Sequence, residues 1–311
     1  MKSQPDQPAC YPRLKVFSIL GAGMIAIGFS PILVRFATDV EPMTLAALRT
    51  LFAALILLPF WYQRRTPLAQ LKSNGVDIRM VMLAGFCLGL HLTFWIASLH
   101  YTSIASATVL VSIQPVLLIV AESLFFKRRF APVVWTGVLL ACFGAVWLGV
   151  LDMGQESLFV DAPFGNFLAL VAAVIFVFYF LIGRKIRQKA EWIDYVFHLY
   201  LHAAVTCIVL TLIWSGGLPY LSSMALLVGL GLAIGPTIIG HGSINYAVKY
   251  ISPTLISTLI LSEIVFAAVM AYFLFQESPG TWSVVAMITI VSGVVLSLSH
   301  KAETLPEKRR L

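Results

Sequence analysis

The sequence predicts an all-α integral membrane protein with ten transmembrane helices, arranged as two inverted repeats of five helices each. Three observations lead to this prediction. The 311 residues are 59% hydrophobic and only 11% charged, with a mean hydropathy of +0.92. The apolar residues fall into long runs, and the second half of the chain repeats the first. A soluble domain of this length would carry far more charge, because its surface faces water.

The apolar runs have the length of membrane-spanning helices. A bilayer core of roughly 30 Å is crossed by a helix of about 20 apolar residues. The runs that meet this length cover approximately residues 16–36, 42–62, 80–100, 104–125, 132–151, 164–183, 194–214, 223–247, 253–275 and 280–299. Most tryptophans lie near the ends of these runs, where aromatic residues meet the two faces of a membrane: Trp61, Trp135, Trp147, Trp192, Trp214 and Trp282. The first run follows a polar leader without a small-residue cleavage site, so we expect it to be retained.

The distribution of Lys and Arg predicts the orientation of the helices. If the helices alternate in direction from a cytoplasmic N-terminus, all of the 21 basic residues except Arg35 and Arg49 fall in cytoplasmic segments. Basic residues are enriched in the cytoplasmic loops of membrane proteins. The sequence therefore predicts a multi-pass protein of the inner cell membrane with both termini in the cytoplasm. The basic residues form short clusters rather than a continuous face, so a nucleic-acid partner is not expected.

The two halves of the chain match at one constant offset. A shift of 149 residues pairs identical residues without a gap: Arg35 with Arg184, Tyr101 with Tyr250, Ser103 with Ser252, Leu110 with Leu259, Phe126 with Phe275, and Gly144 with Gly293. We therefore expect two structural units, residues 16–151 and 164–299.

The second unit is expected to cross the membrane upside down, because each unit has an odd number of helices. The charges agree, since the basic segment 127–129 corresponds to segment 276–278, which has no positive charge. Inverted repeats of this kind are characteristic of secondary transporters, in which the substrate binds near the pseudo-two-fold axis.

Two stretches resemble a known family. Residues 91–127 (HLTFWIASLHYTSIASATVLVSIQPVLLIVAESLFFK) and 240–277 (GHGSINYAVKYISPTLISTLILSEIVFAAVMAYFLFQE) are similar to the third and fourth helices of the two EamA units of the drug/metabolite transporter superfamily. The resemblance covers residues 16–299. It implies ten helices around a central cavity, and the export or exchange of small metabolites, often coupled to protons.

The chain departs from the family pattern in two places. The second unit usually reads Glu-Pro where this chain has Glu263-Ile264, so the resemblance predicts that a proline kink is missing there. The first unit usually ends its fourth helix with Glu, where this chain has Arg128. Neither difference removes the predicted fold, but the first bears on how the helices move.

Glu263 is the leading candidate for a functional residue. It lies about ten residues into its run, which is roughly 15 Å along a helix and close to the middle of the bilayer. An ionisable group at that depth is costly and needs a reason. Its counterpart in the first unit is Gln114. We expect Glu263 to bind a proton or a substrate amine, with a hydrogen-bonded structural role as the alternative.

Histidine, tryptophan and asparagine side chains are the other candidates for the substrate site. His91 and Trp95 are four residues apart and so share one face of the third helix. His241 and Asn245 have the same spacing in the eighth helix, and the family resemblance also favours them because a Gly-His followed by Asn recurs there. Histidine can relay protons near neutral pH, and tryptophan can stack on a flat or cationic substrate. Packed side chains without a role in transport are the alternative.

The seventh helix carries a polar stripe of Tyr195, His198 and His202. Two histidines four residues apart can bind zinc, but a zinc site needs three or four protein ligands, and none is nearby in the sequence. We therefore expect no metal or other cofactor, and place His202 in the lining of the cavity or at a helix contact.

Three further features concern structure more than transport. Arg49 is expected to pair with Glu41 or Asp39, with an anionic substrate as the alternative, and Glu122 is expected to reach water at a membrane face. Ser30-Pro31 predicts a kink in the first helix, and glycines together with Pro236 predict bending in the eighth. Small residues at Gly137, Gly144 and Gly293 are candidate contacts of a homodimer.

The expected function is that of a secondary active transporter. It would carry a small metabolite, amino acid or drug, with protons as the expected coupling ion. An uncoupled channel or facilitator is the first alternative, and a membrane-embedded enzyme is the second. The sequence has no Gly-Lys-Ser/Thr phosphate loop and no His-Glu-x-x-His pair, so neither ATP-driven transport nor hydrolysis is expected.

Overall fold

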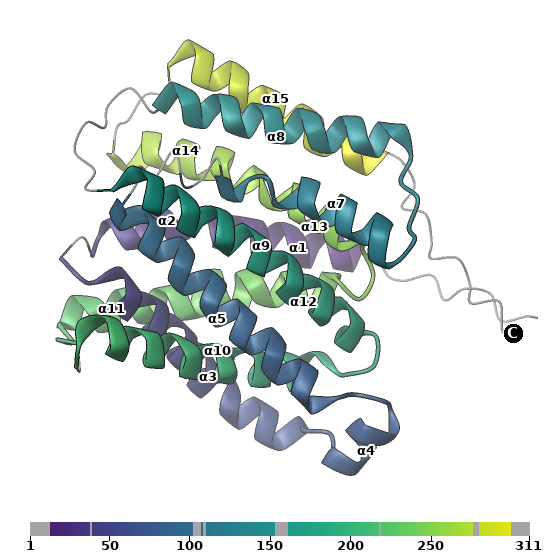
Figure 1. Ribbon diagram of the computed structural model, residues 1–311, viewed down its shortest axis with the longest axis vertical. Coiled ribbons are helices and arrows are strands. Elements are labelled where there is room, and N and C mark those ends of the chain that lie inside the picture. Colours follow the sequence, from purple (N-terminus) through teal and green to yellow (C-terminus); the bar gives the residue numbers. More distant parts are fainter. Residues whose placement is uncertain are drawn as a thin grey trace, which may run out of the picture.

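The structure, a computed structural model, describes residues 13–37, 39–101, 107, 110–152, 161–217, 219–275 and 280–299. Every regular element in these residues is a helix (Figure 1). The first half contains α1 (Arg13–Gly28), α2 (Ser30–Arg35), α3 (Pro42–Arg64), α4 (Leu68–Ser73), α5 (Ile78–Tyr101), α7 (Gln114–Phe125) and α8 (Pro132–Asp152). The second half contains α9 (Ala162–Arg187), α10 (Trp192–Ser215), α11 (Ser223–Leu232), η2 (Ala233–His241), α12 (Gly242–Ala247), α13 (Pro253–Ile260), α14 (Ser262–Phe275) and α15 (Thr281–Ser299).

These helices account for the ten predicted spans. Within the described residues, seven helical segments are long and apolar enough to cross a membrane, and three shorter apolar helices lie in the fourth, fifth and ninth runs. Part of the fourth run, residues 104–106 and 108–109, is outside the described residues. Helix α4 is a short connector between the second and third spans.

Turn and cap residues define where several helices begin and end. The Asp161 side chain accepts a hydrogen bond from the backbone N–H of Phe164, and Ser222 and Ser252 cap α11 and α13 in the same way. Such caps satisfy backbone donors that a helix leaves unpaired at its start. Helix α10 ends at Gly216, which has a left-handed backbone (φ 63°) that glycine adopts without a steric penalty.

Contacts between helices repeat across the two halves of the chain. Related spans pack on each other, as α3 does on α10, α7 on α13, and α8 on α15. The contact of α5 with α9 has its counterpart in the contact of α1 with η2 and α12. The contact of α5 with α10 corresponds in the same way to that of α3 with α11. A pseudo-two-fold relation between the halves explains these pairs, as an inverted repeat requires.

The glycines suggested as dimer contacts are buried inside the chain. A Cβ atom at Gly137 or at Gly293 would meet the backbone of the other helix, at Gly293 and Ser297 or at Gly137 and Ala141. Small residues let membrane helices approach closely, and here they join α8 to α15. Their proposed role between two subunits is therefore wrong, because the partner helix belongs to the same chain.

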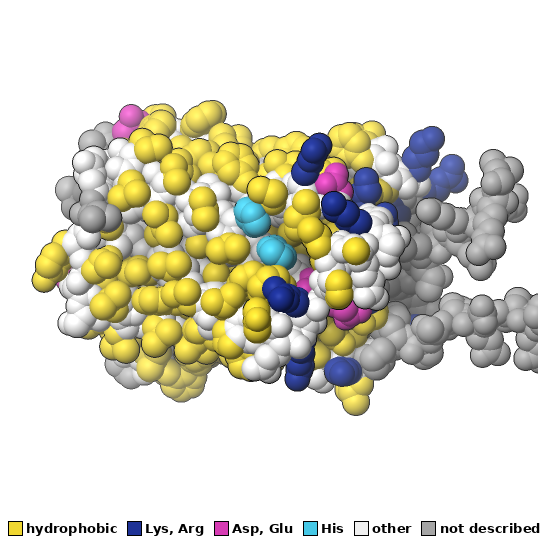
Figure 2. Space-filling view, turned by 90° about the horizontal axis from the view of Figure 1, so that it is seen from below, with side chains coloured by type: hydrophobic (Ala, Val, Ile, Leu, Met, Phe, Trp, Pro, Cys, Tyr) yellow, Lys and Arg dark blue, Asp and Glu magenta, His cyan; other side chains and the backbone are white. Residues whose placement is uncertain are grey.

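The surface carries the pattern of a membrane protein. Figure 2 shows a face that is largely hydrophobic, with Lys and Arg side chains gathered toward one end. Exposed apolar side chains on this and other faces include Leu55, Phe86, Phe143, Val205, Ile213 and Val295. Apolar groups are stable on the outside of a protein only where lipid or another protein covers them. The described residues thus form a multi-pass membrane bundle.

Four of the ten spans are interrupted. The first span breaks at Phe29, immediately before Ser30-Pro31, as the sequence predicts. The eighth contains η2, a π-helical segment around Pro236. Proline in an α-helix clashes with the carbonyl group four residues earlier, and the wider π turn relieves that clash.

The fourth and ninth spans break at matching positions. Ser112 and Ile113 form a turn before α7, and Leu261 separates α13 from α14. The 149-residue offset relates Ser112 to Leu261. The expectation of a missing kink near Glu263 is therefore wrong. The break forms without proline. At this point the Ser262 hydroxyl donates to the carbonyl oxygen of Leu259 (2.6 Å), a local contact that competes with the backbone hydrogen bonds of a helix.

Candidate functional site

Polar residues from four helices meet inside the bundle. We call Arg49, His91, His241 and Glu263 the central cluster. Arg49 comes from α3, His91 from α5, His241 from η2 and Glu263 from the start of α14. The Arg49 charge interacts electrostatically with the other three side chains, and His241 also interacts with His91. Each half of the chain contributes two of the four residues.

Arg49 is the positive centre of this cluster. Its side chain is only 3% exposed, and its Nε donates to the Thr237 hydroxyl (3.0 Å). Among the described residues it forms no ion pair with Glu41 or Asp39, so the expected pairing is wrong. Glu41 instead accepts a hydrogen bond from Ser215 (2.8 Å) near the end of the bundle. Arg49 points inward because the Thr237 oxygen and the buried carboxyl group lie on that side.

The π-helical segment presents Thr237 to Arg49. The Thr237 hydroxyl donates to the carbonyl oxygen of Leu232 (2.9 Å), and its own carbonyl oxygen accepts from the Tyr200 hydroxyl (2.9 Å). Trp192 Nε1 donates to the carbonyl oxygen of Gly242 (2.8 Å), just after the segment. Hydrogen bonds from the side chains of α10 thus add to the backbone bonds of this segment and hold η2 in place.

Glu263 and His241 each have a buried atom without a hydrogen bond. Within the described part of the chain, Glu263 Oε2 and His241 Nδ1 are inaccessible to water and have no hydrogen-bond partner. An unsatisfied buried polar group costs about 1–3 kcal/mol, so such atoms are uncommon. Here two of them lie in one cluster beside a buried guanidinium group. This arrangement suits a site whose missing partner is a bound molecule or a proton.

His91 and Trp95 occupy neighbouring parts of α5. His91 is 6% exposed, its Nδ1 lies 2.9 Å from the carbonyl oxygen of Ala172, and its ring packs near Phe176. Trp95, one turn later, packs on the cluster of Ala46, Ala47, Ile96 and Cys207, the helix surface next to Arg49. His91 therefore has one nitrogen bonded to the protein, and Trp95 contacts α3 and α10 rather than the histidine.

Asn245 has a full set of partners. It is completely buried, its side chain accepts from the Tyr179 hydroxyl (3.0 Å), and its amide donates to the carbonyl oxygen of His241 (2.8 Å). The backbone oxygen of Asn245 accepts from Arg187 (2.9 Å). Asn245 therefore ties α9 to the end of η2 and lies one turn from His241.

Among the described residues, neither Gln114 nor His202 has a hydrogen bond to a residue of the central cluster. Gln114 is 5% exposed and opens α7, just as Glu263 lies at the start of α14. His202 is half-buried, with Nδ1 bonded to the carbonyl oxygen of His198 (2.7 Å), and its Cβ faces Gly85 of α5. Within the described residues no three His, Cys, Asp or Glu side chains are placed to hold a metal ion.

A second ionic cluster lies where the two halves meet near one end of the bundle. We call Glu122, Arg128, Arg184 and Thr254 the Glu122 cluster. Glu122 Oε1 contacts Arg128 (3.1 Å) and Arg184 (3.4 Å), and Oε2 accepts from the backbone N–H (3.0 Å) and hydroxyl (2.6 Å) of Thr254. Glu122 is 1% exposed, so the expectation that it reaches water is wrong. It belongs to α7, whereas Arg184 and Thr254 belong to α9 and α13 of the second half.

The buried positions of Arg49 and Glu122 were not predicted, for the same reason. Both were assigned to a membrane face from their distance to a helix end, which does not show the direction of a side chain. A signal was present for Arg49: it is one of two basic residues outside the cytoplasmic segments. A positive charge that violates the orientation rule needs an internal partner. No sequence signal identified Thr237, because a threonine in an apolar helix is common.

Comparisons with known proteins agree with this architecture. The sequence pattern of the EamA-like transporter family matches residues 14–150 and 163–299. Solute carrier family 35 member G1 from Homo sapiens is 23% identical over 310 residues, which cover 94% of this chain and 82% of that protein. The uncharacterized transporter YxxF from Bacillus subtilis (strain 168) is 23% identical over 273 residues, covering 85% of this chain and 83% of that protein.

A solved structure titled "Crystal structure of protein" has a similar fold. It superposes with a TM-score of 0.77 at 17% sequence identity, and the match covers 92% of this chain and 97% of that one. Identity at this level shows a common fold and no more.

Proposed function

Because the chain belongs to the EamA-like transporter family, and is thus a non-enzymatic membrane transporter, we propose that it is a secondary active transporter. In this proposal the two repeats, residues 16–151 and 164–299, rock against each other and open a central cavity alternately to the two sides of the membrane. The central cluster binds the substrate. Glu263 exchanges a proton during the cycle, and the direction is efflux or exchange of a small molecule.

One observation carries the proposal: among the described residues, Glu263 Oε2 and His241 Nδ1 are buried without a hydrogen bond, and both side chains interact electrostatically with Arg49. A carboxyl group and a guanidinium group that do not form an ion pair can each bind part of a third molecule. Arg49 can hold an anionic group of the substrate, and Glu263 can hold a proton or an amine. Desolvated, oriented groups bind with little reorganisation.

The other candidate residues support the central cluster. His91 has a second ring nitrogen that would contact the substrate, and Trp95 would add an aromatic surface on the same helix. Gln114 occupies the symmetry-related position of Glu263 and would face the substrate from the first repeat. Asn245 positions His241 through its side-chain hydrogen bond. His202 is placed in the wall between α5 and α10, where it would affect the movement of the helices.

The Glu122 cluster supports the proposed movement. It joins α7 and the following loop of the first repeat to α9 and α13 of the second. In this proposal the end that carries the basic residues faces the cytoplasm, with both termini on that side of the inner membrane; the enrichment of basic residues in cytoplasmic loops supports it. In the proposed cycle, opening the cavity to the cytoplasm would separate these helices and break the contacts of the Glu122 cluster. A homodimer would have to use surfaces other than the buried α8–α15 contact.

The test is transport by purified protein in sealed liposomes. Substrate-triggered proton movement is recorded for amino acids, purines, organic anions and cationic dyes, with a pH-sensitive dye trapped inside. We expect a signal for one class, lost in Arg49→Gln and Glu263→Gln. Glu41→Gln is the matched control, since Glu41 is a carboxylate outside the cluster. Substrate flux that ignores a proton gradient in the unmodified protein would instead support an uncoupled facilitator.

A further inference from the structure

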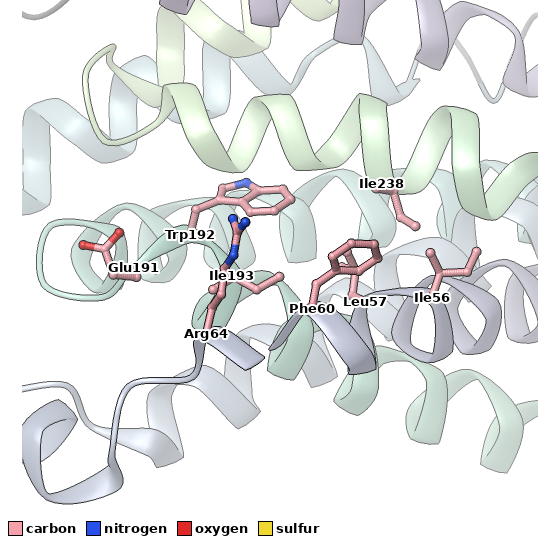
Figure 3. A pocket seen from close by; sticks show the side chains of 8 residues that line it. All are labelled: Ile56, Leu57, Phe60, Arg64, Glu191, Trp192, Ile193 and Ile238. Carbon is pink, nitrogen blue, oxygen red and sulfur yellow. The ribbon is translucent and has the colours of Figure 1, made fainter. Parts of the chain in front are cut away.

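A groove lies between α3, the start of α10 and η2, and none of the four residues of the central cluster is among those that line it. Its cavity volume is about 550 Å³. Figure 3 shows Ile56, Leu57, Phe60 and Ile238 toward one end of the groove, and Arg64, Trp192 and Glu191 toward the other. The groove is therefore apolar along one part and charged at one end.

The position of these residues matches the layers of a membrane. Arg64 is the last residue of α3, and Glu191 immediately precedes α10, so both lie where helices leave the bilayer. Ile56 is eight residues earlier in α3, which corresponds to about 12 Å along the helix toward the membrane interior. A phospholipid has the same polarity profile, with a charged head group at the surface and acyl chains below it.

The charges at the polar end indicate the kind of head group. Among the described residues, Arg64 and Glu191 form no ion pair, although both line the same groove. Arginine binds phosphate well, and a carboxylate binds a primary ammonium group. Arg187 interacts electrostatically with Glu191, but its guanidinium donates to the carbonyl oxygens of Asn245 and Ala190. A head group with only a negative charge would therefore bring its phosphate toward Glu191 without adding a donor for that carboxylate. A head group with a phosphate and a primary amine satisfies both side chains.

The indole ring of Trp192, which lines the same groove, is fixed in place. Trp192 Nε1 is already bonded to the carbonyl oxygen of Gly242 (2.8 Å), so its ring presents an apolar surface to the groove. Tryptophan commonly lies at this level of the membrane, next to lipid head groups. Behind the groove, Ile238 follows Thr237, the residue that holds Arg49. An occupant of the groove therefore touches the helix that supports the central cluster.

We propose that this groove binds one phosphatidylethanolamine molecule from the leaflet at the basic end of the bundle. Its phosphate contacts Arg64, its ammonium group contacts Glu191, and one acyl chain lies along Ile56, Leu57, Phe60 and Ile238. This site is separate from the proposed transport site, and it does not depend on which substrate the protein carries.

Native mass spectrometry of the full-length protein tests the proposal. Detergent-solubilised protein is incubated with equimolar phosphatidylethanolamine, phosphatidylglycerol and phosphatidylcholine of the same chain length, and the retained lipids are measured. We expect phosphatidylethanolamine to be retained about tenfold more strongly than phosphatidylcholine, in which methyl groups replace the N–H donors. The preference should fall to near parity in Arg64→Gln and in Glu191→Gln, while Phe60→Ser should weaken retention of all three lipids.

Arg65→Gln is the matched control, because Arg65 is adjacent in sequence but is not among the residues that line the groove, and stacks on Tyr62 (4.6 Å). It should leave the lipid preference unchanged. Equal retention of the three lipids, or a preference that survives Arg64→Gln and Glu191→Gln, would overturn the proposal. Displacement of the lipid by a transported substrate would also overturn it, since the groove would then be a substrate entrance.

Discussion

Glu122 and Glu263 are two carboxyl groups inside the same apolar bundle, and their surroundings are opposite. Glu122 contacts two arginines and both donors of Thr254, at distances of 2.6–3.4 Å. Glu263 has a buried oxygen without a partner among the described residues, and interacts with Arg49 only at longer range. Glu122 therefore joins the two repeats through hydrogen bonds and an ion pair. In the proposed function, the second carboxyl group, Glu263, takes part in transport instead.

The contrast extends to the arginines. Arg184 and Arg128 hold Glu122 directly, whereas Arg49 is held by Thr237 and stays unpaired with Glu263. A buried ion pair is costly to break, because one partner is left charged and uncompensated. A buried, unpaired cation and carboxyl group lower stability but can bind a ligand. Stability and function are thus assigned to different clusters of the same bundle.

The largest effect on stability should come from Glu122→Ala. This change leaves Arg128 and Arg184 without their carboxylate and Thr254 without its acceptor. We expect a loss of about 3–5 kcal/mol in the free energy of unfolding. Thermal unfolding in detergent measures it, with Glu41→Ala as the control carboxylate. If both variants melt at the same temperature, the Glu122 cluster does not stabilise the contact between the repeats.

Thr237→Val should have an intermediate effect. Valine has nearly the same shape but removes the oxygen that accepts from Arg49 and the hydrogen that is donated to Leu232. We expect a loss of about 1–3 kcal/mol in stability and a higher KM for substrate, because Arg49 is no longer oriented. Steady-state transport and thermal unfolding measure the two quantities. Thr211→Val, which removes another buried hydroxyl, should lower stability without changing KM.

Glu263→Gln should change stability least among the buried acidic residues. Its Oε2 has no hydrogen bond to lose, and a neutral amide is cheaper to bury than a carboxylate. We expect the free energy of unfolding to change by less than about 1 kcal/mol in either direction. The same unfolding assay checks this value. A loss as large as that of Glu122→Ala would show that Glu263 is a structural residue.

A smaller effect is expected at the break between α13 and α14. Ser262→Ala removes the hydroxyl that bonds to the carbonyl oxygen of Leu259, and so favours a continuous helix. We expect stability within about 0.5 kcal/mol of the unmodified protein and a slower transport rate. Ser299→Ala is the control, because its hydroxyl makes the same kind of contact at the end of α15. Equal transport by both variants would show that the break is not used.

The architecture and three of the four residues of the central cluster were predictable from the sequence, but their arrangement around Arg49 was not. Apolar runs and a constant offset of 149 residues can be recognised without knowing how the helices pack, so they indicated the spans and the repeat. Glu263, His91 and His241 were found because polar groups inside apolar runs are conspicuous. Their relation to Arg49 depends on side-chain direction and on contacts between distant helices. The break before Glu263 occurs without a proline, so the sequence carried no recognised signal for it.

The most direct test of the account separates substrate binding from proton coupling in Glu263→Gln. Reconstituted protein is assayed in two ways: exchange of labelled for unlabelled substrate at equal pH, and accumulation of substrate driven by a pH gradient. We predict that Glu263→Gln retains exchange and loses accumulation, while Glu41→Gln retains both. Full gradient-driven accumulation by Glu263→Gln would contradict the assignment of the proton to this carboxyl group. Loss of exchange and accumulation together, in a folded variant, would assign Glu263 to substrate binding instead.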